Sequence, residues 1–207
     1  MAIHVSHKTR IVVIVAVLAG ILVAASLFFS RNCPNTGFAL TDNARQLHRL
    51  KNRTQIPKLI DFDSRVSLDA LLNPGNDTSR WSTERAARIS GYVVAVAYAR
   101  PEATNCFVPF RRDIHINVAN RKDALKSEQV VVEVTPGLRD WAKQQGVDWS
   151  ESSLQSQLMG HRVEFEGWLY FDVGHAEEAE NTAPRNPENW RATAWEIHPV
   201  TGIRVIE

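Results

Sequence analysis

Polar and apolar residues alternate in five separate segments of this chain, and this pattern restricts the fold more than any other feature. A period of two is typical of β-strands that bury one face. The segments are residues 89–99, 113–119, 129–135, 162–172 and 191–198. One helical stretch lies between the third and fourth segments, with Ser150 as its expected N-cap and Gly160 at its expected end. The sequence therefore predicts the element order β-β-β-α-β-β.

This element order is that of an OB-like fold, a mainly β, five-stranded Greek-key barrel in which the third strand lies between the second and the fifth. We assign the barrel domain to residues 66–207. Two short helices are expected at its start, one within residues 66–75, stopped by Pro74 and Gly75, and one over residues 82–88 with Ser82 as its cap. Closure would remove the exposed edges that short strands otherwise leave. An open α+β meander is the alternative.

An unbroken apolar run without any charge occupies residues 11–29. As a helix rising about 1.5 Å per residue, it would nearly span the ~30 Å hydrocarbon core of a bilayer. It is also longer than the apolar region of a cleaved signal peptide, which has about 7–15 residues. The sequence therefore predicts a transmembrane signal anchor, preceded by an N-terminal cap (1–10) and followed by a basic tether (30–65). The lipid bilayer would then be a partner of the chain.

The charges around this run predict its orientation. Lys8 and Arg10 precede it and favour a cytoplasmic N-terminus. We therefore expect a single-pass protein of the inner (cytoplasmic) membrane, with its body on the periplasmic or other extracytoplasmic side. An exported body would allow Cys33 and Cys106 to form a disulfide, and two free thiols are the alternative.

The near-neutral formal charge of +1 hides an asymmetry between the two parts of the chain. Residues 1–60 contain eight Lys or Arg and one acid, net +7, whereas residues 61–207 contain 16 bases and 22 acids, net −6. Nucleic-acid binding depends on cations that neutralise phosphates. The acidic barrel domain therefore argues against a nucleic-acid partner, although six Trp would suit base stacking.

Two blocks near the C-terminus share a pattern with other proteins. They fit the motifs GWLxFDxxH, starting at residue 167, and WRATxWEIHPVT, starting at residue 190, and residues 113–116 and 132–136 belong to the same pattern. The chain resembles an uncharacterised bacterial membrane-anchored family with these blocks, over roughly residues 66–205. The resemblance implies a bacterial envelope protein, and it supplies no catalytic residues.

Polar side chains gather on the predicted non-core faces of the second, third and fifth strands, and two more follow the fourth strand. They are Asp113, His115, Asn117, Glu133, Thr135, Glu196 and His198, joined by Asp172 and His175. Imidazoles beside carboxylates are suited to a structural hydrogen-bond network, to ligand binding, or to metal and acid–base chemistry. The motifs of known metal or hydrolase sites, such as HExxH, are absent from the sequence, so no metal or cofactor is expected.

These patterns lead to one functional hypothesis and one rival. The first is a membrane-anchored binding or scaffolding module of the bacterial cell envelope, not an enzyme, with an envelope protein as a possible partner. The rival is a metal-dependent hydrolase of phosphoester type that uses the His/carboxylate face. Trp195 is expected in the core, while Trp168 and Tyr170 should face outward and pack under the long loop over residues 173–190, which is either functional or a solvated flap.

Overall fold

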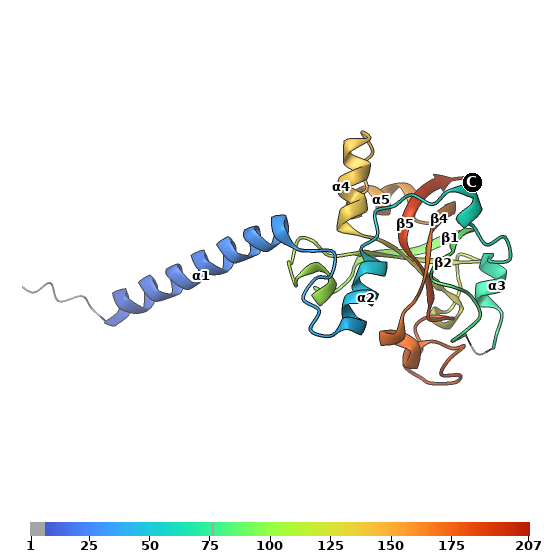
Figure 1. The fold of residues 1–207 in the computed structure, drawn as a ribbon, viewed down its shortest axis with the longest axis horizontal. Helices are drawn as coiled ribbons and strands as arrows, with labels where there is room; N and C mark the ends of the chain where they lie inside the picture. Colours follow the sequence, from blue (N-terminus) through green and yellow to red (C-terminus); the bar gives the residue numbers. More distant parts are fainter. Residues whose placement is uncertain (1–6, 76) are drawn as a thin grey trace, which may run out of the picture.

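Five strands form a closed barrel in the computed structural model, which describes residues 7–75 and 77–207 (Figure 1). The strands are β1 (Ala86–Tyr98), β2 (Ile114–Ala119), β3 (Val130–Val134), β4 (Arg162–Phe171) and β5 (Trp195–Val205). Their order around the barrel is β1-β2-β3-β5-β4, and only the β3–β5 pair among them is parallel. The prediction of a five-stranded barrel with its third strand between the second and the fifth is confirmed, and the open meander is excluded.

The barrel core comes from the inward positions of the alternating strands. Phe165, Leu169, Ile197 and the valines of β3 are completely buried, and Trp195 is only 2% exposed. At about 25 cal/mol per Å² of apolar area removed from water, these side chains supply most of the driving force for closure. Gly167 is required where β4 crosses β5, because a Cβ atom there would lie 2.3 Å from the carbonyl oxygen of Pro199.

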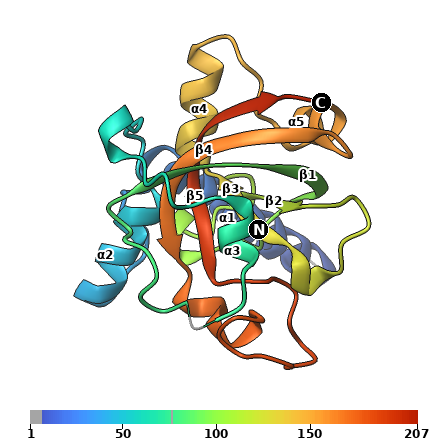
Figure 2. The same cartoon turned by 90° about the vertical axis from the view of Figure 1, so that its right-hand side faces the viewer.

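Short helices cover the barrel from outside (Figure 2). They include α3 (Leu68–Leu72), α4 (Pro136–Gln144) and α5 (Glu151–Leu158), together with the 3-10 turns η1 (Leu59–Asp61), η2 (Ala103–Asn105), η3 (Lys126–Glu128) and η4 (Val173–Glu178). Ser150 caps α5 as predicted, because its Oγ accepts a hydrogen bond from the backbone N–H of Ser153. The helix predicted over residues 82–88 is wrong: β1 already begins at Ala86, which pairs with Trp168 of β4.

The N-terminal helix α1 (His7–Asn32) contains the predicted membrane span and extends away from the barrel (Figure 1). Of the predicted N-terminal cap, residues 1–6 lie outside the described residues. Within residues 7–75 and 77–207, no helix has both the length and the apolar character needed to cross a membrane.

The region expected as a basic tether is packed against the barrel. Helix α2 (Asp42–Lys51) ends in Lys51, which is buried, and a disulfide joins Cys33 to Cys106 in the β1–β2 loop. The following residues cover β4, since the indole N–H of Trp168 donates a hydrogen bond to the carbonyl of Gln55.

This packing corrects the prediction of which segment covers two aromatic side chains of β4. Trp168 and Tyr170 were expected to face outward under residues 173–190, but they are 5% and 4% exposed and lie beneath the segment after α2. Arg53 lies over the Trp168 ring at 4.8 Å, and Lys51 lies 5.7 Å from the Tyr170 ring centre. The alternation was read correctly, but both faces of β4 are covered.

Candidate functional site

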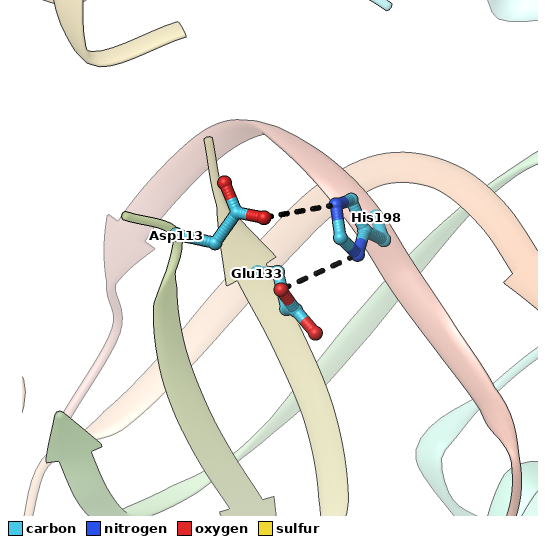
Figure 3. Close-up of side chains that lie close together, drawn as sticks. All are labelled: Asp113, Glu133 and His198. Atoms are coloured by element: carbon cyan, nitrogen blue, oxygen red, sulfur yellow. Dashed lines mark ion pairs between the residues drawn. The ribbon is translucent and has the colours of Figure 1, made fainter. Parts of the chain in front are cut away.

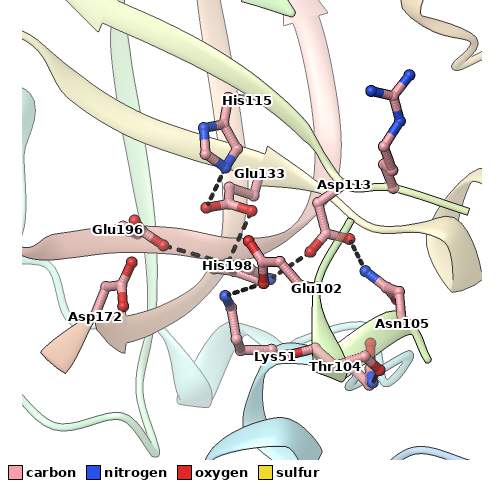
Figure 4. A network of polar contacts seen from close by, with 12 residues as sticks. Lys51, Glu102, Thr104, Asn105, Asp113, His115, Glu133, Asp172, Glu196 and His198 are labelled. Carbon is pink, nitrogen blue, oxygen red and sulfur yellow. Dashed lines mark hydrogen bonds and ion pairs between the residues drawn. The ribbon is translucent and has the colours of Figure 1, made fainter. Parts of the chain in front are cut away.

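A buried network of charged side chains covers the non-core face of β2, β3 and β5 (Figure 4). Asp113 directly precedes β2, Glu133 lies on β3, and Glu196 and His198 lie on β5. The barrel order makes these three strands neighbours, and the register places His115 opposite Glu133. The β1–β2 loop, the end of α2 and the β4–β5 segment close over this face and exclude water from it.

His198 lies at the centre of the network and is completely buried (Figure 3). Its Nδ1 is 3.2 Å from Glu196 Oε2 and 3.4 Å from Glu133 Oε2, and its Nε2 is 3.9 Å from Asp113 Oδ2. Burial alone would lower the pKa of this imidazole, but Glu133 and Glu196 beside it raise the pKa to about 10. His198 is therefore an imidazolium at neutral pH in the metal-free protein.

The three neighbouring carboxyls respond differently to the same surroundings. Burial raises the pKa of Asp113 to about 6, and the nearby His198 only partly offsets that effect. The pKa of Glu133 is held well below its usual range despite burial, because His115 and His198 both lie against it. The pKa of Glu196 is raised by burial and by the charge of Glu133. The pKa of each carboxyl thus depends on which cations lie closest to it.

Two fixed cations enter the network from outside the strands. Arg191, completely buried, places Nη1 2.5 Å from Glu196 Oε1 and 3.7 Å from Asp172 Oδ2. Lys51 Nζ lies 3.1 Å from Glu102 Oε2. Although burial lowers the pKa of Lys51, the surrounding carboxylates, Glu133 foremost, hold it well above its ordinary value. Five carboxyls therefore share these two cations and the neighbouring imidazoles.

A cleft of about 560 Å³ opens beside the network, between the β1–β2 loop, β2 and the β4–β5 loop. It is lined by Tyr98, Ala99, Arg100, Glu102, His115, His175, Glu178 and Trp190. Two of these side chains are histidines backed by buried carboxylates: His115 Nε2 lies 3.0 Å from Glu133 Oε1, and His175 Nδ1 lies 2.5 Å from Asp172 Oδ2.

The electrostatic state of both cleft histidines follows from these carboxylates. Burial lowers the pKa of His115, but Glu133 outweighs this effect and raises it. The hydrogen bond to Asp172 raises the pKa of His175. Both rings therefore favour the protonated, donor-only form that can face an anion.

Trp190 forms the wall between the two histidines. Its ring stacks on His115 at 6.3 Å, with 9° between the planes, and meets His175 edge-on at 5.4 Å. The Arg191 guanidinium lies 3.9 Å from the same ring centre. Because these neighbours occupy the ring, Trp190 fixes the positions of the imidazoles and is not a free stacking platform.

Seven of the nine residues predicted for the polar face lie in this network or line its cleft: Asp113, His115, Glu133, Asp172, His175, Glu196 and His198. The other two do not join it. Asn117 donates a hydrogen bond to Gln129, and Thr135 is buried at the start of α4.

Sequence reasoning missed the cations of the site. Lys51 comes before the barrel strands, its partner Glu102 lies in the loop after β1, and no local pattern marks either of them. Arg191 and Trp190 lie within the WRATxWEIHPVT block. The clustering of charged and aromatic residues in that block could have indicated that they belong to the site. Polar side chains hydrogen-bond within the loop over residues 173–190, for example Asn189 Nδ2, which donates to the carbonyl of Ala183.

Comparison with known proteins adds no homologue: no family model, curated protein or solved structure matches the chain. The resemblance to a bacterial membrane-anchored family stays a prediction.

Proposed function

We propose that this protein is a binding module of the bacterial cell envelope and that its ligand is a small anionic molecule held in the cleft. The single observation that carries the proposal is the pair of carboxylate-backed histidines, His115 and His175, in one cleft. Each buried carboxylate keeps its imidazole protonated and fixes the ring, so two charge-assisted donors are ready before a ligand arrives.

The position of the cleft supports a binding role. OB-like barrels bind ligands on the face of their second and third strands and between the loops that follow the first and fourth strands. The cleft lies between those two loops, with Arg100 on one side and His175 on the other.

The two acids of the cleft already have partners, so they oppose an anion less than free carboxylates would. Glu102 pairs with Lys51, and Glu178 accepts a hydrogen bond from the indole N–H of Trp190. Arg100 and the two imidazoles then leave the cleft with a surplus of donors toward a carboxylate, phosphate or sulfate group.

The Cys33–Cys106 disulfide supports the envelope location, because structural disulfides persist in oxidising compartments outside the cytoplasm. The same location follows from the apolar run at residues 11–29, which we retain as a proposed anchor on sequence grounds. A scaffolding role through an envelope protein partner is compatible with a small-molecule site on the barrel.

The test is a thermal-shift screen of the full chain at pH 6.5 against small molecules that carry phosphate, carboxylate or sulfate groups, followed by calorimetry. His175→Gln should weaken binding of a true ligand about tenfold or more, since a hydrogen bond to a charged group contributes about 1.5–3 kcal/mol. The matched control is His161→Gln, because His161 is exposed and lies outside the cleft. A ligand bound equally by the wild type and His175→Gln, or no ligand in the whole panel, would disprove the proposal.

A further inference from the structure

Three side chains of the buried network converge on one point (Figure 3). Asp113, Glu133 and His198 come from three neighbouring strands or their ends, and all are at most 1% exposed. One possible ligand atom from each lies within 4.8 Å of the other two. Glu133 and His198 lie on strands, and Asp113 directly precedes β2, where its carbonyl accepts a hydrogen bond from the backbone N–H of Ala99.

Each of these residues also has a buried polar atom without a hydrogen-bond partner in the part of the chain that the structure describes. The atoms are Asp113 Oδ2, Glu133 Oε2 and His198 Nε2. Buried polar atoms are nearly always hydrogen-bonded, so unpartnered ones need an explanation. Three in one place point to a missing partner that they share.

The remaining polar atoms of the same side chains are already held in place. Asp113 Oδ1 accepts a hydrogen bond from Asn105, Glu133 Oε1 lies 3.0 Å from His115 Nε2, and His198 Nδ1 lies 3.2 Å from Glu196 Oε2. Outer partners of this kind orient the ligands of metal sites and leave the inner atoms free for the ion.

We propose that Asp113, Glu133 and His198 form a binding site for one divalent transition-metal ion, held by one carboxylate oxygen from each acid and one imidazole nitrogen of His198. One imidazole and two carboxylates suit Zn²⁺, Mn²⁺ or Fe²⁺, and three protein ligands leave a coordination position open. Two ligands at about 2.1 Å from an ion lie at most about 4.2 Å apart. The 3.9 Å between His198 Nε2 and Asp113 Oδ2 lies within that limit.

The charges around the three residues leave room for a divalent cation. Five carboxyls, those of Glu102, Asp113, Glu133, Asp172 and Glu196, face the fixed cations Lys51 and Arg191 and the imidazoles of His115, His175 and His198. An ion bound to His198 would displace the proton of that imidazole, so the ion would take the place of an existing positive charge. Glu102 and His115, drawn in Figure 4, belong to the network and also line the cleft. The site stands apart from the anion proposed for the cleft, and either could exist without the other.

The test uses the full chain, freed of metal with a chelator and titrated with Zn²⁺ or Mn²⁺ alone in a calorimeter. We expect one ion per chain and a rise in Tm on binding. Asp113→Asn and Glu133→Gln keep side-chain shape and should weaken binding by more than about tenfold. The matched control is Asp140→Asn, which is exposed on α4 and should bind the ion as the wild type does.

A direct spectroscopic readout on the wild type keeps the proposal testable if the buried variants fail to fold. Bound Mn²⁺ should show pulsed electron paramagnetic resonance couplings to one imidazole nitrogen. Absence of saturable binding, a signal without a nitrogen ligand, or equal affinity in Asp113→Asn and the wild type would overturn the site. The negative charges of the buried carboxyls would then be compensated by protonation and by the neighbouring cationic side chains, without a metal ion.

Discussion

Arg191 Nη1 lies 2.5 Å from Glu196 Oε1, and both side chains are completely buried. The pair joins the segment that leads into β5 to the strand itself, and Arg191 also reaches Asp172 at 3.7 Å. A single guanidinium therefore compensates two buried carboxylates. Removal of this cation should lower the stability of the protein more than removal of any other cation of the network.

Arg191→Met should destabilise the protein by about 3–5 kcal/mol, because it leaves Glu196 buried without its cation. Urea unfolding followed by circular dichroism measures the loss. The control is Arg204→Met, which breaks the exposed pair with Glu164 and should change stability far less. The double variant Arg191→Met/Glu196→Gln should recover part of the loss. Equal effects of Arg191→Met and Arg204→Met would show that the buried pair is not important for stability.

The His175–Asp172 pair should make stability depend on pH. The pKa of His175 is raised and that of Asp172 is lowered, chiefly by their mutual hydrogen bond against the burial of Asp172. The contribution of His175 is complete below its ordinary pKa of about 6.5 and is lost as pH rises through the raised value. That of Asp172 is present above its ordinary pKa of about 3.9 and is lost as pH falls through the lowered value.

We therefore expect the stability difference between wild type and His175→Gln to be largest near pH 5–6 and to shrink toward alkaline pH. Unfolding curves at pH 5.5, 7 and 8.5 provide the measurement, with His161→Gln as the control. A difference that grows with pH would reverse the assigned direction of the His175 shift.

Trp195→Ala should cost about 3–5 kcal/mol, because it opens a cavity in a core without room to collapse. The ring is 2% exposed and meets Trp81 and Phe171 edge-on at 5.7 and 5.3 Å. Trp195→Phe keeps much of the volume and loses mainly the hydrogen bond from Nε1 to the carbonyl of Asp77, so its cost should be smaller. If the two variants are equally unstable in urea, the hydrogen bond and not the packing dominates.

Replacing both cysteines of the Cys33–Cys106 disulfide with serine should lower stability by about 2–4 kcal/mol, since the bridge closes a long loop between residues 73 positions apart. The barrel should still fold, because its strands do not depend on the bridge. Thermal unfolding of the wild type with and without reductant is the parallel measurement. Unchanged Tm in both experiments would mean that α2 holds its place without the disulfide.

Periodicity predicted the barrel well because each strand buries one apolar face. This burial requires apolar and polar residues to alternate, and the alternation can be read from neighbouring residues alone. The segment over residues 113–119, for example, shows its alternation without reference to the rest of the chain, and it became β2 within one residue. Strand order followed from the position of the helix between the third and fourth strands. His115 and Glu133 were placed on one face for the same reason, and the register puts them opposite each other.

The parts that were missed depend on contacts between distant segments. Trp168 and Tyr170 alternate as outward residues should, but a segment from before the barrel covers them. The same holds for Lys51, whose pKa is raised by four carboxyls from elsewhere in the chain, those of Glu102, Glu133, Asp172 and Glu196. The helix predicted over residues 82–88 is wrong for another reason. Ser82 Oγ does accept a hydrogen bond from the backbone N–H of Glu84, but pairing of the following residues with β4 outweighs this cap.

The docking of Lys51 has a consequence for how the chain must fold. The carboxylates it compensates come from the β1–β2 loop, β3, the end of β4 and β5, and contacts between residues so distant in sequence are slow to form because long loops must close first. Until Lys51 and Arg191 are both in place, the closing strands would bring like charges together in a medium of low dielectric constant. The last strand and the helix before the first one should therefore dock in the same cooperative step. Assembly of the network then marks the moment at which the native state is complete.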